Sequence, residues 1–118
     1  MTRQTLEQQR AQNAWEACAN FGKEHVNIAK SLPALIMNSG LMQVMAFAHQ
    51  KGASHEMVAA KLREWLSGQF PNKVKSDFPG FMQSLMNLEP HEYQAINAEA
   101  FAWLKWLRHM ATARKEGN

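Results

Sequence analysis

The histidine and cysteine side chains are the first candidates for catalysis or metal binding in this chain of 118 residues. The only cysteine, Cys18, excludes the usual thiolate zinc site, and between Ala17 and Ala19 it is expected to be a small packing residue in a reducing compartment. The histidines show no helical metalloprotease spacing, since no second histidine follows at the required position after any of them. These histidines are His25, His49, His55, His91 and His109.

Glycine-rich and nucleophile motifs are missing from the sequence as well. It contains no phosphate-binding G-x-x-x-x-G-K-[ST] loop, no G-x-S-x-G elbow and no dinucleotide fingerprint, and its six glycines are scattered singly. We therefore expect no enzymatic activity, no metal and no cofactor.

Basic residues are the more promising feature, although the net charge is only +3. A mild positive excess permits contact with nucleic acid without requiring it. One interpretation is a solvated surface with favourable charges at helix C-termini. The other is a surface that binds phosphates without reading sequence. The residues concerned are Lys51, Lys61, Arg63, Lys73 and Lys75 in the middle of the chain and Lys105, Arg108, Arg114 and Lys115 near its end.

The composition predicts an all-α protein, and residues 1–118 are expected to form a single compact bundle of about five to six helices. Apolar residues make up 46% of the chain, nine of the ten acidic residues are Glu, and no segment alternates with period two. We expect helices over residues 5–22, 23–39, 41–50, 54–67, 79–87 (beginning at Pro79 or Gly80) and 90–114, with a loop over 68–79.

Local signals support these boundaries. Thr5 and Gln8 have the spacing of a capping box, and Ser54 is expected to cap the fourth helix. Pro33 predicts a kink or restart within the second helix, because proline lacks a backbone donor and clashes with the preceding turn. Gly40 predicts a stop, since glycine readily adopts a positive φ.

Two apolar stripes predict which helix faces are buried. In the first helix Arg10 interrupts an otherwise apolar stripe. Either it is buried against a partner, for which Glu99 or a helix end is suitable, or the stripe is partly open and Arg10 faces RNA or another protein; we slightly favour the buried pair. Phe101 and Trp106 flank the stripe of the last helix and are either packed or available for stacking. That stripe comprises Tyr93, Ile96, Ala100, Trp103, Leu104, Leu107 and Ala111.

No secretory signal is visible in the polar N-terminal segment, and the apolar stretches look far short of a membrane span. We expect a cytoplasmic protein with no membrane contact.

Three segments together resemble a known family. Arg10-Ala11, followed by Trp15-Glu16, resembles its R-A-x-x-A opening. Residues 32–41, followed by Gln43, Ala46 and Phe47, closely resemble its hallmark L-P-A-L-I-x-x-N-G-L-x-Q-x-x-A-F. Residues 99–108 resemble its closing E-A-x-x-[FYW]-L-x-W-L-[KR]. The chain is similar to the fifth Cmr protein family, the small α-helical subunit of type III-B CRISPR complexes; Ser39 departs from the usual Asn, and residues 68–79 have no counterpart.

The resemblance implies a non-catalytic small subunit that stacks in several copies beside guide RNA and target RNA, together with the other Cmr subunits, and supports target-RNA binding in antiviral defence. Within the matched motifs, the candidate RNA-binding residues are Arg10, Asn38, Gln43, Lys105 and Arg108. Charge alone adds Lys51, Lys61, Arg63, Lys73 and Lys75.

Three other functions stay open. A purely protein-binding structural adaptor would join the same assembly without touching RNA. A stand-alone helical nucleic-acid-binding regulator of the helix-turn-helix kind would use the turn at 38–41, but the following helix offers few base-reading side chains. An enzyme is the least favoured.

Overall fold

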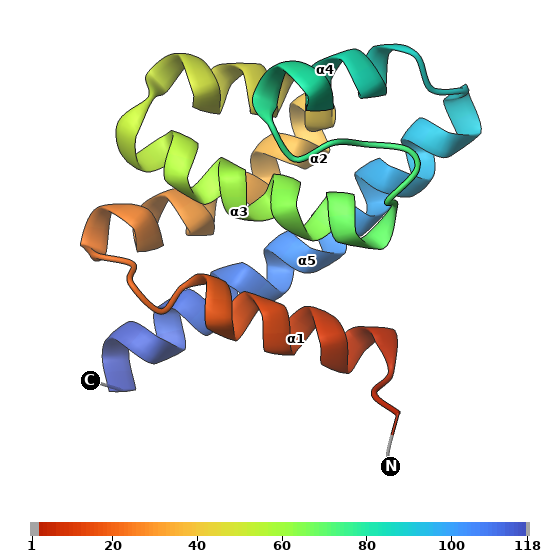
Figure 1. Ribbon diagram of the computed structural model, residues 1–118. Coiled ribbons are helices and arrows are strands. Elements are labelled where there is room, and N and C mark those ends of the chain that lie inside the picture. The colour runs from red at the N-terminus through yellow and green to blue at the C-terminus, as the bar shows by residue number, and fades with distance from the viewer. Residues whose placement is uncertain (1–2, 118) are drawn as a thin grey trace.

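The computed structural model describes residues 3–117, with side chains described through residue 115, and in this range the chain forms five helices and no strand (Figure 1). The predicted all-α fold class is confirmed. The helices are α1 (Leu6–Ala17), α2 (Lys23–Lys51), α3 (Ala53–Gln69), α4 (Phe78–Met86) and α5 (Pro90–Gly117).

Helix α5 crosses the molecule and packs against α1, α2 and α3 (Figure 1). Its predicted stripe is buried from Ile96 to Ala111, and Trp103 is completely inaccessible to solvent. Tyr93, the first member of the stripe, is only partly buried. Because a stripe at helical spacing occupies one side of a helix, burying it leaves the opposite side of α5 available for other contacts.

Helix α2 bends at Gly40, where φ is 81° and ψ is 164°, a region of backbone conformation that is essentially restricted to glycine. A bend leaves amide groups of the following turn without intrahelical acceptors. Two side chains of α5 supply acceptors: Leu41 N–H donates to Asn97 Oδ1 at 2.9 Å, and Met42 N–H donates to Tyr93 Oη at 3.3 Å. The predicted break at Gly40 is therefore confirmed, and α5 stabilises it.

The kink predicted at Pro33 is wrong, because the only non-helical backbone angles within α2 are those of Gly40. Pro33 is buried beside Leu32, and packing of this segment keeps the backbone helical in spite of the missing N–H. The first helix is also shorter than expected and ends at Ala17. Phe21 packs instead against His25 at the start of α2, with ring centroids 5.4 Å apart.

Ser54 does not cap α3, contrary to the sequence-based prediction. The N-cap is Gly52, whose carbonyl accepts hydrogen bonds from the amides of His55 and Glu56. Gly52 has φ 70°, so the tight turn between α2 and α3 depends on glycine. Because α3 begins directly after this turn, at Ala53, Ser54 already lies inside the helix and cannot be its N-cap. Helix α4 begins slightly earlier than expected, since Asp77 caps it by accepting from Gly80 N–H.

Among the described helices, α2 alone has the length and apolar composition of a membrane-spanning helix. The sequence-based expectation that every apolar stretch is much shorter than a membrane-spanning helix is therefore wrong for α2. Core helices meet the same criteria, and α2 is such a helix: it is bent at Gly40 and packs against both α3 and α5.

Candidate nucleic-acid interface

The exposed side of α5 carries Lys105 and Arg108. Neither forms an ion pair with any side chain that the structure describes. Lys105 Nζ lies 4.9 Å from the centroid of the Phe101 ring, a cation–π distance that positions the ammonium without neutralising it. Both predicted residues are thus free to attract phosphate groups.

A groove of about 430 Å³ separates α1 from α5. Trp106 is half-buried in it, which leaves part of the indole available for contact. Lys105 and His109 flank the indole from α5, and Glu7 is the one acidic residue in the lining. An aromatic surface beside cations is a suitable site for a stacked base with a neighbouring phosphate.

A second groove, of about 200 Å³, lies between the start of α2 and the end of α5. Lysines line both of its sides: Lys23 and Lys30 come from α2 and Lys115 from α5. The sequence analysis named Lys115 among the basic residues near the end of the chain but did not include Lys23 and Lys30. More than 80 residues separate them from Lys115, so no local pattern brings them together.

Arg10 is paired, as the favoured interpretation of the sequence predicted. Its guanidinium donates two hydrogen bonds of 2.7 Å to Glu99, which also accepts 3.0 Å from Trp65 Nε1. The hydrogen bond with Glu99 is the main cause that raises the pKa of Arg10. The guanidinium fork is thus occupied by Glu99, although the side chain keeps 22% exposure at the edge of the α1–α5 groove.

Arg63 lies inside the protein with only 4% of its surface exposed. It forms an ion pair with Glu56 and donates to the carbonyl of Ser76 at 2.9 Å, so it joins α3 to the segment before α4. Burial disfavours the charged form of Glu56, but hydrogen bonds from Arg63 and His49 outweigh it, and the pKa of Glu56 is lowered. Arg63 is therefore positioned to hold the fold together, away from the exposed cations.

The remaining basic candidates lie on different parts of the surface. Lys51 stands 5.8 Å from the Phe47 ring, and Lys73 pairs with Glu92. Lys61 lines a groove of mixed charge with Glu16 and Glu64. Lys75 belongs to the segment before α4, beside Lys73. The structure does not bring these four lysines together with Lys105 and Arg108.

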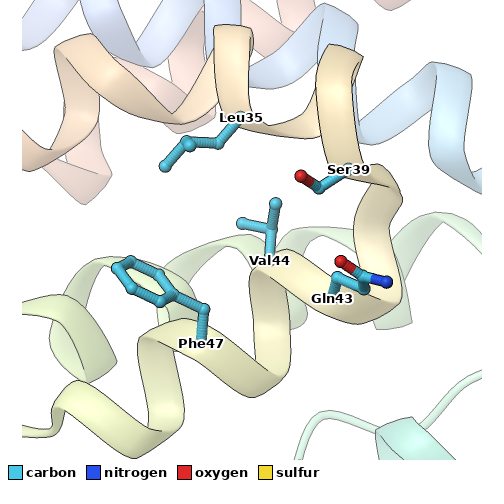
Figure 2. Close-up of a pocket in the computed structure, with 5 residues that line it drawn as sticks. All are labelled: Leu35, Ser39, Gln43, Val44 and Phe47. Carbon is cyan, nitrogen blue, oxygen red and sulfur yellow. The ribbon is translucent and has the colours of Figure 1, made fainter.

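Asn38 and Gln43 flank the bend at Gly40. Gln43 lies at the edge of an apolar groove of about 180 Å³ that the two halves of α2 form where they meet (Figure 2). Leu35 from one half and Val44 and Phe47 from the other provide its apolar surface. Met37, which is 73% exposed, does not line this groove; it is two residues from both Leu35 and Ser39, so it lies on the opposite side of the same helical segment.

The His, Cys, Asp and Glu side chains are the possible metal ligands of this chain. Within the described residues, no set of three or more of them is placed to hold a metal ion. Cys18 is buried, and burial is the main cause that raises the pKa of its thiol, as suits the packing role expected from the sequence.

Comparison with known proteins identifies the family to which this helical fold belongs. The model of a family described as CRISPR-associated protein (Cas_Cmr5) matches residues 6–114. The chain belongs to the Cmr5 family of CRISPR-associated proteins. A solved structure of a CRISPR-associated Cmr5 family protein from Thermus thermophilus is similar, with a TM-score of 0.78 and 25% identity over 93% of this chain and 97% of that one. No curated protein matches at a significant level.

Family membership confirms the resemblance of the three sequence segments, and the fold explains them. In this Cmr5-family chain the central segment builds the bend of α2, with Gly40 at its corner and Leu41 bonded to α5. The first and last segments meet through Arg10 and Glu99. Most of the residues that match the motifs therefore maintain the fold, whereas Arg108, at the final [KR] position of the closing motif, stays exposed.

Proposed function

We propose that this chain is the non-catalytic small subunit of a type III-B CRISPR effector complex, in which several copies stack along the guide RNA and the target RNA. In this role it joins other Cmr subunits, supports the binding of target RNA in antiviral defence, and leaves cleavage to other subunits. Family membership over residues 6–114 supports a place in such a complex.

The observation that carries RNA contact is the exposed pair Lys105 and Arg108 on α5. Their charges are not neutralised by any described acidic side chain, and Lys105 lines the groove that contains Trp106. Lysine and arginine side chains of this kind bind phosphates irrespective of sequence. Such binding suits a subunit whose RNA partners vary, because base pairing between guide and target then supplies the specificity.

The apolar corner at Gly40 supports contact with protein. A stack of identical chains needs two different patches that meet head to tail without closing on themselves. Phe47 in this corner is 43% exposed, and Met37, on the opposite side of the preceding helical segment, is 73% exposed. Burying large apolar side chains is the usual driving force of association. We assign this corner to a neighbouring subunit.

Coexpression with the other Cmr subunits and a guide RNA tests the proposal. The wild-type chain should co-purify with both. The variant K105E/R108E should still assemble but bind target RNA more weakly, and the difference should be larger at low salt than at high salt because salt screens exposed charges.

The matched control is K61E/K75E, which reverses the same number of charges at lysines that the structure places apart from Lys105 and Arg108. A wild-type chain that never joins the complex would refute the proposed function. Equal weakening by both double variants would mean that only net charge matters, and unchanged binding by K105E/R108E would remove these two residues from the interface.

A purely protein-binding adaptor is the second candidate, and the apolar corner is the observation that favours it. Crosslinking of the assembled complex separates the two functions. An adaptor gives crosslinks from this chain to protein alone, whereas the proposed subunit also gives crosslinks to RNA from α5.

A further inference from the structure

The groove between the start of α2 and the end of α5 has cationic walls on both sides. Lys23, Asn27 and Lys30 recur at intervals of four and three residues, so they lie along one side of α2. Thr112 and Lys115 are three residues apart and form the facing wall from α5. Val26 is buried between the walls, and none of the six lining residues is acidic.

We infer that this groove, which we call the lysine groove, binds consecutive backbone phosphates of an RNA strand. Lys23, Lys30 and Lys115 are exposed and form no ion pair with any described side chain. Lys23 and Lys30 are two helical turns apart, or about 10 Å along the axis, so their ammonium groups follow a strand and do not converge on a single ion. The side-chain amide of Asn27 adds a group that can donate to phosphate oxygens.

The chemistry of the walls favours phosphates over bases as the ligand. Lysine is a flexible point charge without the planar fork of arginine, so it attracts phosphate but discriminates poorly among base edges. The lining contains no aromatic ring on which a base would stack. The positive end of α2 lies beside Lys23, and the N-cap residue Gly22 has no side chain with which to satisfy the first turn. Glu24 in the first turn offsets part of that positive end, so the attraction for an anion comes mainly from the lysines.

The position of the groove favours RNA over an acidic protein surface. Arg108, Thr112 and Lys115 follow one another at intervals of four and three residues on α5, so the lysine groove continues the surface that carries Lys105 and Arg108. One strand can therefore contact both parts. The inference rests on the proposed function and identifies a second, previously unassigned part of its RNA-binding surface.

The test uses the complete complex assembled with guide RNA. The variant K23Q/K30Q/K115Q removes three positive charges from the lysine groove, and K61Q/K73Q/K75Q removes three from other parts of the surface. Binding of a target RNA is measured at several salt concentrations. We expect the groove variant to bind target RNA about tenfold more weakly at low salt. The slope of log affinity against log salt concentration should also become less steep, by about 2 for each copy that contacts RNA. The control variant should stay close to wild type.

A second readout is the reactivity of each lysine toward an acylating reagent in the wild-type complex, measured by mass spectrometry. Adding target RNA should protect Lys23, Lys30 and Lys115 more than Lys61, Lys73 and Lys75. Equal affinities for the two triple variants, together with no RNA-dependent protection, would overturn the inference. Loss of assembly with undiminished RNA affinity in the complexes that remain would also overturn it and would assign the groove to an acidic protein partner.

Failure of the inference is distinguishable from failure of the proposed function. If K105E/R108E weakens RNA binding and the groove variant does not, the lysine groove alone is refuted. If the wild-type chain joins no complex or contacts no RNA, both are refuted.

Discussion

At the scale of single residues, Glu99 connects three helices. It lies on α5, is only 8% exposed, and accepts hydrogen bonds from Arg10 on α1 and Trp65 on α3. Every one of these bonds stabilises the charged carboxylate, which would be costly to bury alone. This contact explains why Arg10 interrupts the apolar stripe of the first helix: its guanidinium pairs with Glu99.

Replacing Glu99 with alanine should lower the free energy of unfolding by about 3 kcal/mol, because it leaves the Arg10 guanidinium and the Trp65 N–H without their acceptor. Urea unfolding measures this. Glu16→Ala, which removes an exposed hydrogen bond from Gln12, should change stability by no more than about 0.5 kcal/mol. The double variant R10A/E99A should cost at least about 1 kcal/mol less than the sum of the single changes; strict additivity would show that the pair is uncoupled.

Glu56 makes the stability of the fold depend on pH. Its pKa is lowered because hydrogen bonds from Arg63 and His49 outweigh the opposing effect of burial. A lowered folded-state pKa means that the ionised group stabilises the fold above its ordinary pKa of 4.5 and loses this contribution as the pH falls through the folded-state value.

The variant Glu56→Gln should therefore be less stable than wild type at neutral pH, and the difference should narrow as the pH is lowered below about 4. Urea unfolding at a series of pH values tests this. A difference that stays constant from neutral to acidic pH would show that the charge of Glu56 is not responsible.

At the scale of elements, the bend of α2 determines where the two halves of that helix can pack. The glycine backbone at residue 40 allows the change of direction, and Asn97 and Tyr93 accept hydrogen bonds from the two amides that follow. Proline at residue 33, by contrast, causes no comparable change. Packing of a long buried segment overcomes a single lost hydrogen bond, whereas a positive φ is a conformation that other residues strongly disfavour.

Gly40→Ala should destabilise the protein by about 2 kcal/mol, because alanine is strained at φ 81° and its Cβ would lie 3.4 Å from Tyr93 Oη. Thermal unfolding measures the loss. Gly68→Ala is the matched control: a Cβ there has no neighbour within 4 Å, and alanine favours the helix, so stability should be equal to wild type or higher by up to about 1 kcal/mol. An unchanged melting temperature for Gly40→Ala would contradict the role given to the bend.

At the scale of the whole molecule, the surfaces assigned to RNA and to protein lie on different elements. The cationic residues belong to α5 and the start of α2, whereas the apolar corner belongs to the middle of α2. This separation allows one copy to contact RNA and a neighbouring subunit at the same time, as a stacked assembly requires.

Met37→Gln should leave the free energy of unfolding within about 0.5 kcal/mol of wild type, since the side chain is 73% exposed, but should lower the number of copies in the assembled complex. Native mass spectrometry counts the copies. Met86→Gln makes the same change at another exposed methionine, on α4, and should leave the number unchanged. If both variants assemble like wild type, Met37 does not lie in a subunit contact.

Much of the helical arrangement was predictable because local rules govern it. The stripe from Ile96 to Ala111, the capping box at Thr5 and the stop at Gly40 depend on residues close together in the sequence, and the structure confirms them. Predictions that depended on one residue in isolation, such as the cap at Ser54 and the kink at Pro33, were wrong because the glycine turn at Gly52 and the packing around Pro33 determine what those residues do.

The amino-acid sequence by itself determined an all-helical protein of the Cmr5 family, since helical periodicity and the residues at the α2 bend are properties of contiguous segments. Only the tertiary structure decided which charges are available. Arg10 and Arg63 are bonded to Glu99 and Glu56, whereas Lys23 and Lys30 are placed opposite Lys115. The physical reason is that the residue type fixes the charge of a side chain, whereas its burial and its ion pairs depend on side chains from distant parts of the chain.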